Sequence, residues 1–201
     1  MWEIEKELQS EGYLSICGVD EAGRGPLAGP VFAAAVVLPF GIEIPGINDS
    51  KKLSAEKREK LYKEIIEIAK TYAIASADHT EIDELNILNA TYLAMNRAIE
   101  ALSPAPSIAM IDGNRNSGIT SKSKCITGGD GLSASIAAAS ILAKVSRDRY
   151  MTAIAVEYPE YMFEKHKGYG TKLHYEKLLE HGPSEIHRKT FIKNLKNAHT
   201  P

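Results

Sequence analysis

Runs of apolar and β-branched residues along the chain predict five β-strands. The first two runs, residues 16–19 and 31–38, flank a turn rich in glycine and proline and are expected to pair as antiparallel neighbours. Three further runs predict strands over residues 72–77, 108–111 and 124–127. A sheet of five short strands is therefore expected.

Between the strands, apolar residues recur at helical spacing. The spacing predicts a helix over residues 55–70. Thr80, followed three residues later by Asp83, has the pattern of a capping box and predicts the start of a second helix, which ends before Pro104. A long helix is expected over 133–157, and its alanine-rich first half allows close packing against a sheet.

This order of elements is typical of an α/β fold with a mixed sheet and helices on its faces. Charge is unevenly distributed: residues 165–201 carry a net charge of +5 and residues 1–164 carry −7, within a total of −2. We therefore interpret residues 1–158 as a core and 159–201 as a basic helical extension packed on it. A basic tail suits contact with a polyanion, although from charge alone a solvated helical surface is the better explanation.

Several classes of protein are excluded by composition. No run of about 18 apolar residues predicts a membrane helix, and the acidic opening lacks the pattern of a signal peptide. Cys17 and Cys125 are far apart and form no C-x-x-C motif, so neither a disulfide scaffold nor a zinc module is supported. A cytoplasmic location is expected.

Acidic residues stand where three of the predicted strands end. They are Asp20 with Glu21, Asp112 and Asp130. Carboxylates at several strand ends are tolerable when a cation binds among them, and oxygen ligands suit Mg²⁺ or Mn²⁺. Two such ions can hydrolyse a phosphodiester. For any single aspartate, capping of a loop is the better explanation; for four acids together, a metal site is at least as good.

The segment after the first strand raises a geometric condition. Successive residues of a regular strand point to opposite faces, so Asp20 and Glu21 share a metal cluster only if the chain leaves strand geometry there. Gly23 and Gly25 permit such a departure. Their backbone N–H groups could approach a sugar-phosphate closely, and Arg24 could pair with a phosphate; a simple tight turn is the alternative.

Polar residues form a stripe along the predicted long helix. Ser140 and Lys144 are spaced to hold a phosphate, and a solvated face is an equally good explanation. Asp148 is expected to pair with Arg147, Arg149 or a neighbouring loop.

The basic tail contributes one further candidate. Tyr169 lies between two glycines, and its ring could stack on a sugar or base or simply pack. His174, His181 and His187 are not spaced to lie on one helical face as ligands, so they are interpreted as packing or surface residues.

At these positions the sequence resembles the ribonuclease HII family. The matching stretches are GVDEAGRGPLAGPV (18–31), NDSKKLS (48–54), ILNATYLAMNRAI (87–99), IDGN (111–114), GGD (128–130), SIAAASILAKVSRDRYM (135–151), HKGYGTKLH (166–174) and GPSEIHRKTF (182–191). The resemblance implies the ribonuclease H-like fold, a mixed five-stranded sheet flanked by helices with a helical C-terminal part.

The resemblance also implies the roles of individual residues. The catalytic and metal-binding acids of the family correspond to Asp20, Glu21, Asp112 and Asp130. Its substrate-binding positions correspond to Gly23, Arg24, Gly25, Ser140, Lys144, Tyr169 and, with a weaker role, Lys51. The glycine-arginine-glycine motif contacts the 2′-hydroxyl and its phosphate, and the tyrosine stacks on the next deoxynucleotide sugar. Gly128 stands where many relatives have a lysine.

The function so implied is a metal-dependent ribonuclease H, a hydrolase. It uses Mn²⁺ or Mg²⁺ to cut the RNA strand of RNA–DNA hybrids and to incise 5′ to single ribonucleotides in duplex DNA, leaving 5′-phosphate and 3′-hydroxyl ends. No membrane and no stable protein partner is implied, and a monomer is expected. The alternatives are a nuclease of the same fold that cuts DNA alone, and a non-catalytic hybrid-binding protein.

Overall fold

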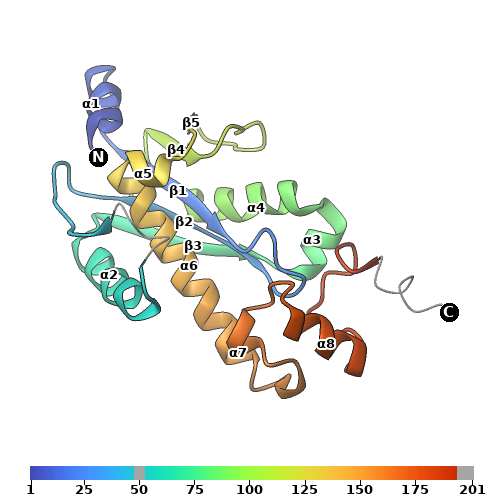
Figure 1. Cartoon of the computed structure of the whole chain (residues 1–201). Helices are drawn as coiled ribbons and strands as arrows, with labels where there is room; N and C mark the ends of the chain where they lie inside the picture. The colour runs from blue at the N-terminus through green and yellow to red at the C-terminus, as the bar shows by residue number, and fades with distance from the viewer. Residues whose placement is uncertain (48–52, 194–201) are drawn as a thin grey trace.

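Five strands form one mixed sheet in the order β3-β2-β1-β4-β5 (Figure 1). The computed structural model describes residues 1–47 and 53–193. The strands are β1 (Ile16–Ala22), β2 (Val31–Val37), β3 (Thr71–Ala77), β4 (Ile108–Asp112) and β5 (Ser123–Ile126). The predicted α/β class and five-stranded mixed sheet are confirmed.

The direction of the strands brings distant parts of the chain to one edge of the sheet. β1 is antiparallel to β2, as predicted, and parallel to β4, which is in turn parallel to β5. Because parallel strands end at the same edge, the acids at the ends of β1 and β4 are brought together. The β1–β4 ladder stops at the pair Val19↔Ile111, so the end of β1 extends past its partner.

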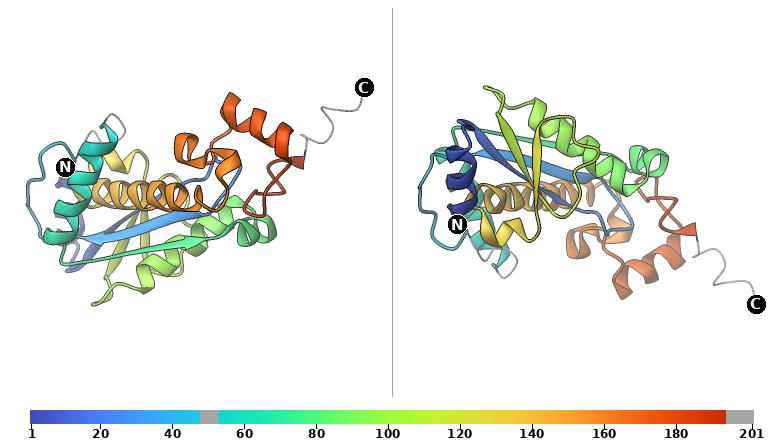
Figure 2. Two further views of the ribbon diagram at one scale, coloured as in Figure 1. Left: turned by 90° about the horizontal axis from the view of Figure 1, so that it is seen from below. Right: turned by 90° about the horizontal axis from the view of Figure 1, so that it is seen from above.

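Helices cover both faces of the sheet (Figure 2). They are α1 (Glu3–Ser10), α2 (Ala55–Ile68), α3 (His79–Leu85), α4 (Ile87–Glu100), α5 (Gly129–Leu132), α6 (Ala134–Ile154), α7 (Phe163–His166) and α8 (Lys172–His181), with a 3-10 turn, η2 (Pro159–Tyr161). Along β2, Ala33 and Ala35 pack toward α4, whereas Ala34 and Val36 pack toward α2 and α6. Burial on both faces explains the unbroken apolar run of this strand.

Helix α6 lies directly against β1. A Cβ atom on Gly18 would come 2.1 Å from the backbone carbon of Ser135, so only glycine fits beneath the start of the helix. The alanine-rich first half of α6 is buried, as its sequence predicted. This close contact places Ser140, one helical turn further on, beside the end of β1.

Three local features differ from the sequence-based expectations. The single helix expected between Thr80 and Pro104 is instead two helices, α3 and α4, which are separated at Asn86, where φ is +67°. The capping box of α3 is formed by Asp78 and Glu81, and the predicted box from Thr80 to Asp83 is wrong. Asp78 accepts hydrogen bonds from the backbone N–H groups of residues 80 and 81, and Glu81 bonds back to the Asp78 amide. Asp83 instead accepts from the backbone of Lys189 and residue 190. Helix α1 was not predicted, because its eight residues bury few apolar side chains.

The C-terminal helices pack beside the turn between β1 and β2. Their apolar cluster includes Phe163 and Leu178 together with Leu27 from that turn. The Leu27 amide donates to the Gly168 carbonyl at 2.8 Å, and the Leu27 carbonyl accepts from the Arg188 amide at 2.8 Å. A core boundary at residue 158 stays a prediction. No helix in the described part of the chain is long and apolar enough to cross a membrane.

Candidate active site

A cavity of about 370 Å³ opens at the edge where β1 and β4 end. Its lining consists of Asp20, Glu21, Ala22, Gly23, Arg58, Asp112, Ser140, Ile141, Lys144 and Tyr169. Seven of these are predicted site residues, and they come from the ends of two strands, β1 and β4, from helix α6 and from the C-terminal segment, which are far apart in the chain. Tertiary structure therefore unites three of the four acids with three of the predicted phosphate or sugar contacts and one glycine.

The carboxylates in this cavity repel one another in a poorly solvated place. Asp20 is only 6% exposed. Burial raises the pKa of Asp20 well above its usual value, and the charges of Glu21 and Asp112 raise it further. Burial also raises the pKa of Glu21, against the opposing charge of Arg24. A divalent cation would relieve both effects.

From the sequence, the chain is expected to leave strand geometry at Asp20 and Glu21 if both are to share a metal cluster, and this expectation is wrong. β1 continues in regular pairing with β2 through Ala22, so the chain does not leave strand geometry at the two acids. Both residues nevertheless line the same cavity, because β4 no longer covers this end of β1 and Glu21 lies at an open edge. The Glu21 amide donates to Oδ1 of Asp20 at 2.7 Å.

The other two predicted acids are placed differently. Asp112 ends β4, lines the cavity and accepts a hydrogen bond from the Gly129 amide at 2.7 Å. Asp130 follows Gly129 in the short helix α5 and is half-buried. Among the described residues, those that line the cavity do not include Asp130, so its assignment as a fourth ligand stays a prediction.

The donor set fits hard divalent cations. Carboxylate oxygens and a hydroxyl are the ligands that Mg²⁺ and Mn²⁺ accept. Within residues 1–47 and 53–193, no group of three or more His, Cys, Asp or Glu side chains is already arranged to hold an ion. Raised carboxylate pKa values and the mutual repulsion of the acids make the cavity receptive to positive charge.

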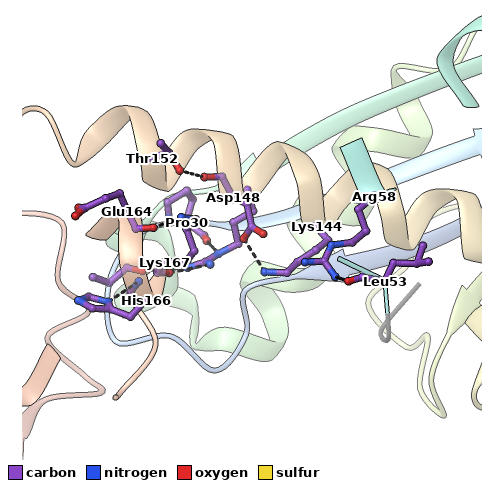
Figure 3. A network of polar contacts seen from close by, with 12 residues as sticks. Pro30, Leu53, Arg58, Lys144, Asp148, Thr152, Glu164, His166 and Lys167 are labelled. Atoms are coloured by element: carbon purple, nitrogen blue, oxygen red, sulfur yellow. Dashed lines mark hydrogen bonds and ion pairs between the residues drawn. The ribbon is translucent and has the colours of Figure 1, made fainter. Parts of the chain in front are cut away.

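A lysine and an aromatic ring line the cavity together with the acids. Lys144 and Tyr169 line the cavity, and Nζ of Lys144 lies 5.7 Å from the centre of the Tyr169 ring. Lys144 also forms an ion pair with Asp148 at 2.6 Å, shown in Figure 3, so the expectation that Asp148 pairs with Arg147 or Arg149 is wrong. The i,i+4 spacing on one face of α6 favours this partner over its sequence neighbours. The Tyr169 side chain is 39% exposed and accessible to a ligand.

The two glycines of the glycine-arginine-glycine segment have different surroundings. Gly23 has φ +101°, and a Cβ there would lie 2.0 Å from Nε of Arg147, so glycine is needed for contact with the protein interior. Gly25 is exposed, a Cβ atom there would have no neighbour within 4 Å, and the position leaves room for a ligand. Arg24 is half-exposed and pairs with Glu21 at 3.3 Å, so a phosphate would have to compete with this carboxylate.

One charged residue of the cavity, Arg58, was not identified from the sequence. One predicted substrate contact, Lys51, lies outside the described residues. Arg58 of α2 lines the cavity and donates to the Leu53 carbonyl at 2.6 Å (Figure 3). The nearby stretch with two lysines was the only sequence signal for it. Lys51 is not among the residues that the structure describes.

The sheet order, the flanking helices and an acidic cavity at the strand ends define a nuclease-like protein of the ribonuclease H-like fold. The family model described as Ribonuclease HII matches residues 17–194. Ribonuclease HII of Caldicellulosiruptor saccharolyticus is 58% identical over 194 residues, which cover 96% of this chain and 95% of that protein. The chain belongs to the ribonuclease HII family, and it is a ribonuclease H-type endonuclease.

Solved structures agree with this assignment. The ribonuclease H2 from Pyrococcus horikoshii OT3 superimposes with a TM-score of 0.74 at 27% identity, covering 91% of this chain and 96% of that one. The same fold is found in the PCNA:RNase HII complex from Archaeoglobus fulgidus (TM-score 0.72, 24% identity, 92% and 97% covered). It is also found in Bst-RNase HIII in complex with Mn²⁺ (TM-score 0.67, 20% identity, 92% and 70% covered).

Proposed function

We propose that this enzyme incises 5′ to single ribonucleotides in duplex DNA, in addition to cutting the RNA strand of RNA–DNA hybrids. The observation that carries this proposal is the convergence of Asp20, Glu21 and Asp112 with Lys144 and Tyr169 around one cavity. Acids alone would suit any metal-dependent phosphodiesterase. A lysine and an exposed tyrosine in the same cavity add places for a phosphate and a sugar.

The acids would hold the metal. Asp20, Glu21 and Asp112 are the ligands that we assign from the cavity, and Asp130 is the fourth by family resemblance. When two Mn²⁺ or Mg²⁺ ions are bound, they supply activation of a water molecule and stabilisation of the leaving oxygen. In-line attack on the phosphate would leave a 5′-phosphate and a 3′-hydroxyl.

The remaining residues recognise and orient the substrate. Gly25 leaves the backbone accessible to a 2′-hydroxyl, which is the group that distinguishes RNA from DNA. Ser140 and Lys144 approach the phosphate from α6, and Lys144 exchanges its bond to Asp148 for one to the phosphate. Tyr169 presents its exposed ring to the sugar of the following deoxynucleotide. Arg24 and, outside the described residues, Lys51 add contacts to the phosphate backbone.

The test is cleavage of an end-labelled DNA duplex that contains one ribonucleotide, with Mn²⁺, Mg²⁺ or EDTA. We expect a single incision on the 5′ side of the ribonucleotide in either metal and none in EDTA. The 3′-hydroxyl product should be extendable by a DNA polymerase. An otherwise identical all-DNA duplex is the control. Its cleavage would favour a nuclease that ignores the 2′-hydroxyl, and binding without cleavage in both metals would favour a non-catalytic hybrid-binding protein.

A further inference from the structure

Two completely buried arginine side chains contact residues that line the cavity. Arg147 of α6 and Arg188 of the C-terminal segment both have 0% exposed surface. Within residues 1–47 and 53–193, neither guanidinium forms an ion pair with a carboxylate. Burial lowers the pKa of both side chains, that of Arg188 to about 9, with the charge of Arg147 contributing. Burying a cation that no carboxylate contacts directly is costly, so the groups to which these guanidiniums donate hydrogen bonds indicate their role.

Arg188 binds the glycine-arginine-glycine loop from behind. Its guanidinium donates to the carbonyl of Gly23 at 2.6 Å, to that of Arg24 at 2.9 Å and to that of Gly29 at 2.9 Å. These acceptors lie about 160 residues away in sequence. With three carbonyl oxygens held by one rigid planar group, the backbone from residue 23 to residue 29 has little freedom to rotate.

Arg147 joins the same loop to the segment that carries the tyrosine. It donates to the carbonyls of Pro30 at 3.0 Å and Ala28 at 3.2 Å, and to that of Lys167 at 3.0 Å. Its guanidinium centre also lies 5.5 Å from the centre of the Tyr169 ring. One side chain therefore contacts the β1–β2 turn and the turn that precedes the tyrosine.

We propose that Arg147 and Arg188 are positioning residues that hold the Gly23–Gly25 loop and Tyr169 at a set separation. Given the proposed function, that separation is the one between the 2′-hydroxyl of a ribonucleotide and the next deoxyribose. Recognition of the RNA–DNA junction then depends on two interior residues that touch no substrate. Their two positive charges also favour the approach of phosphate to the loop.

The most direct test replaces each arginine by lysine. The substitution keeps the positive charge but removes the planar guanidinium group with its several N–H donors. An ammonium group cannot span three carbonyls, so Arg188→Lys and Arg147→Lys should loosen the loop. The kinetic constants kcat and KM are compared on two substrates, a DNA duplex with one ribonucleotide and a long RNA–DNA hybrid. The long hybrid offers many phosphate contacts and several registers, whereas the single ribonucleotide offers one.

We expect the ratio of kcat/KM for the single ribonucleotide to kcat/KM for the hybrid to fall about tenfold in each variant, mainly through KM. Arg149→Lys is the matched control, because the same chemical change is made two residues along α6 on an exposed guanidinium paired with Glu59. Its ratio should stay within about twofold of the wild type. Equal losses on both substrates, or no loss, in a variant that melts cooperatively would overturn the proposal.

A measurement on the unmodified enzyme covers the case in which the variants do not fold. The amides of Leu27 and Gly29, which donate to the carbonyls of Gly168 and Ile186, should exchange slowly in the free protein and gain little further protection from a ribonucleotide duplex in Ca²⁺, because this part of the loop is already held. Strong protection only on binding would contradict positioning by the arginines. If the wild type cleaves neither substrate, the proposed function fails; if it cleaves both and the variants keep its ratio, only this inference fails.

Discussion

The Nε2 atoms of His174 and His187 lie 3.0 Å apart inside the C-terminal part of the molecule. That distance requires one N–H and one bare nitrogen. His187 Nδ1 accepts from the Ser184 amide at 2.9 Å, so its Nε2 carries the hydrogen and donates to His174. Nδ1 of His174 then donates to the Tyr169 carbonyl at 3.0 Å. Both rings must be neutral for this chain of hydrogen bonds to exist.

Acid should therefore destabilise the fold through these rings. Burial lowers the pKa of His174 and of His187 to about 4, with the charge of a neighbouring histidine adding to the effect. Because the folded-state pKa values lie below the unfolded value of 6.5, the unfolded chain binds more protons between them. Stability is present above about pH 6.5 and is lost as the pH falls toward 4.

The check is urea unfolding of wild type, His174→Gln and His181→Gln at several pH values between 7 and 4.5. Each proton taken up on unfolding contributes about 1.4 kcal/mol per pH unit to the slope, and His174→Gln should remove about one. His181 is partly exposed and serves as the matched control, with a slope like that of the wild type. A wild-type slope in His174→Gln would contradict the neutral-pair assignment.

Replacing Asp20 by asparagine should lower the cleavage activity and raise the thermal stability of the metal-free protein. Asp20→Asn removes a metal ligand at nearly constant volume, so we expect cleavage to fall at least about 1,000-fold. Hybrid binding should be largely retained. Because burial raises the pKa of Asp20, its ionised form disfavours folding at neutral pH, and removing the charge should raise the Tm of the metal-free protein.

These two effects of Asp20→Asn are measured by cleavage in Mn²⁺ and by thermal melting in EDTA. A gain of 1 kcal/mol corresponds to about 2–4 °C in a protein of this size. Mn²⁺ should raise the Tm of the wild type more than that of the variant. Undiminished activity would show that Asp20 holds no metal.

The ion pair between Lys144 and Asp148 should compete with substrate. If Lys144 must leave Asp148 to reach a phosphate, Asp148→Asn should tighten substrate binding. A half-exposed pair of this kind is worth about 0.2–1 kcal/mol, so we expect Kd to fall up to about fivefold. The effect should vanish in a Lys144→Met background. Equal effects in both backgrounds would show that Asp148 acts independently of the lysine.

Tyr169 should matter most where the substrate offers a single junction. Tyr169→Ala removes the stacking ring, and base or sugar stacking on an aromatic side chain is worth about 1–3 kcal/mol. Incision at a single ribonucleotide should therefore fall about 10- to 100-fold, with a smaller loss on a long hybrid. Tyr169→Phe keeps the ring and is expected to retain most of the activity. Equal losses on the two substrates would contradict a junction role.

The order of elements and three of the site acids could be predicted from local pattern. Apolar runs and helical spacing follow from burial along one strand or one helix face, so they are visible within a short window of sequence. Acids at strand ends stand out because a buried strand excludes them. The sequence therefore predicts that Asp20, Glu21 and Asp112 lie at strand ends. That the three side chains share one cavity follows only from the tertiary structure.

Tertiary structure decided what each charge does. Positive charge in residues 165–201 was interpreted as surface charge, yet Arg188 from that segment is fully buried and holds a loop about 160 residues away. Whether an arginine faces water or backbone carbonyls depends on the packing of distant elements, which no local pattern encodes. In the same way, Asp148 pairs with Lys144, and Gly23 is glycine because Arg147 lies against it. Residue types and their spacing determined the fold and its chemistry; long-range contact alone selected the partner of each buried charge.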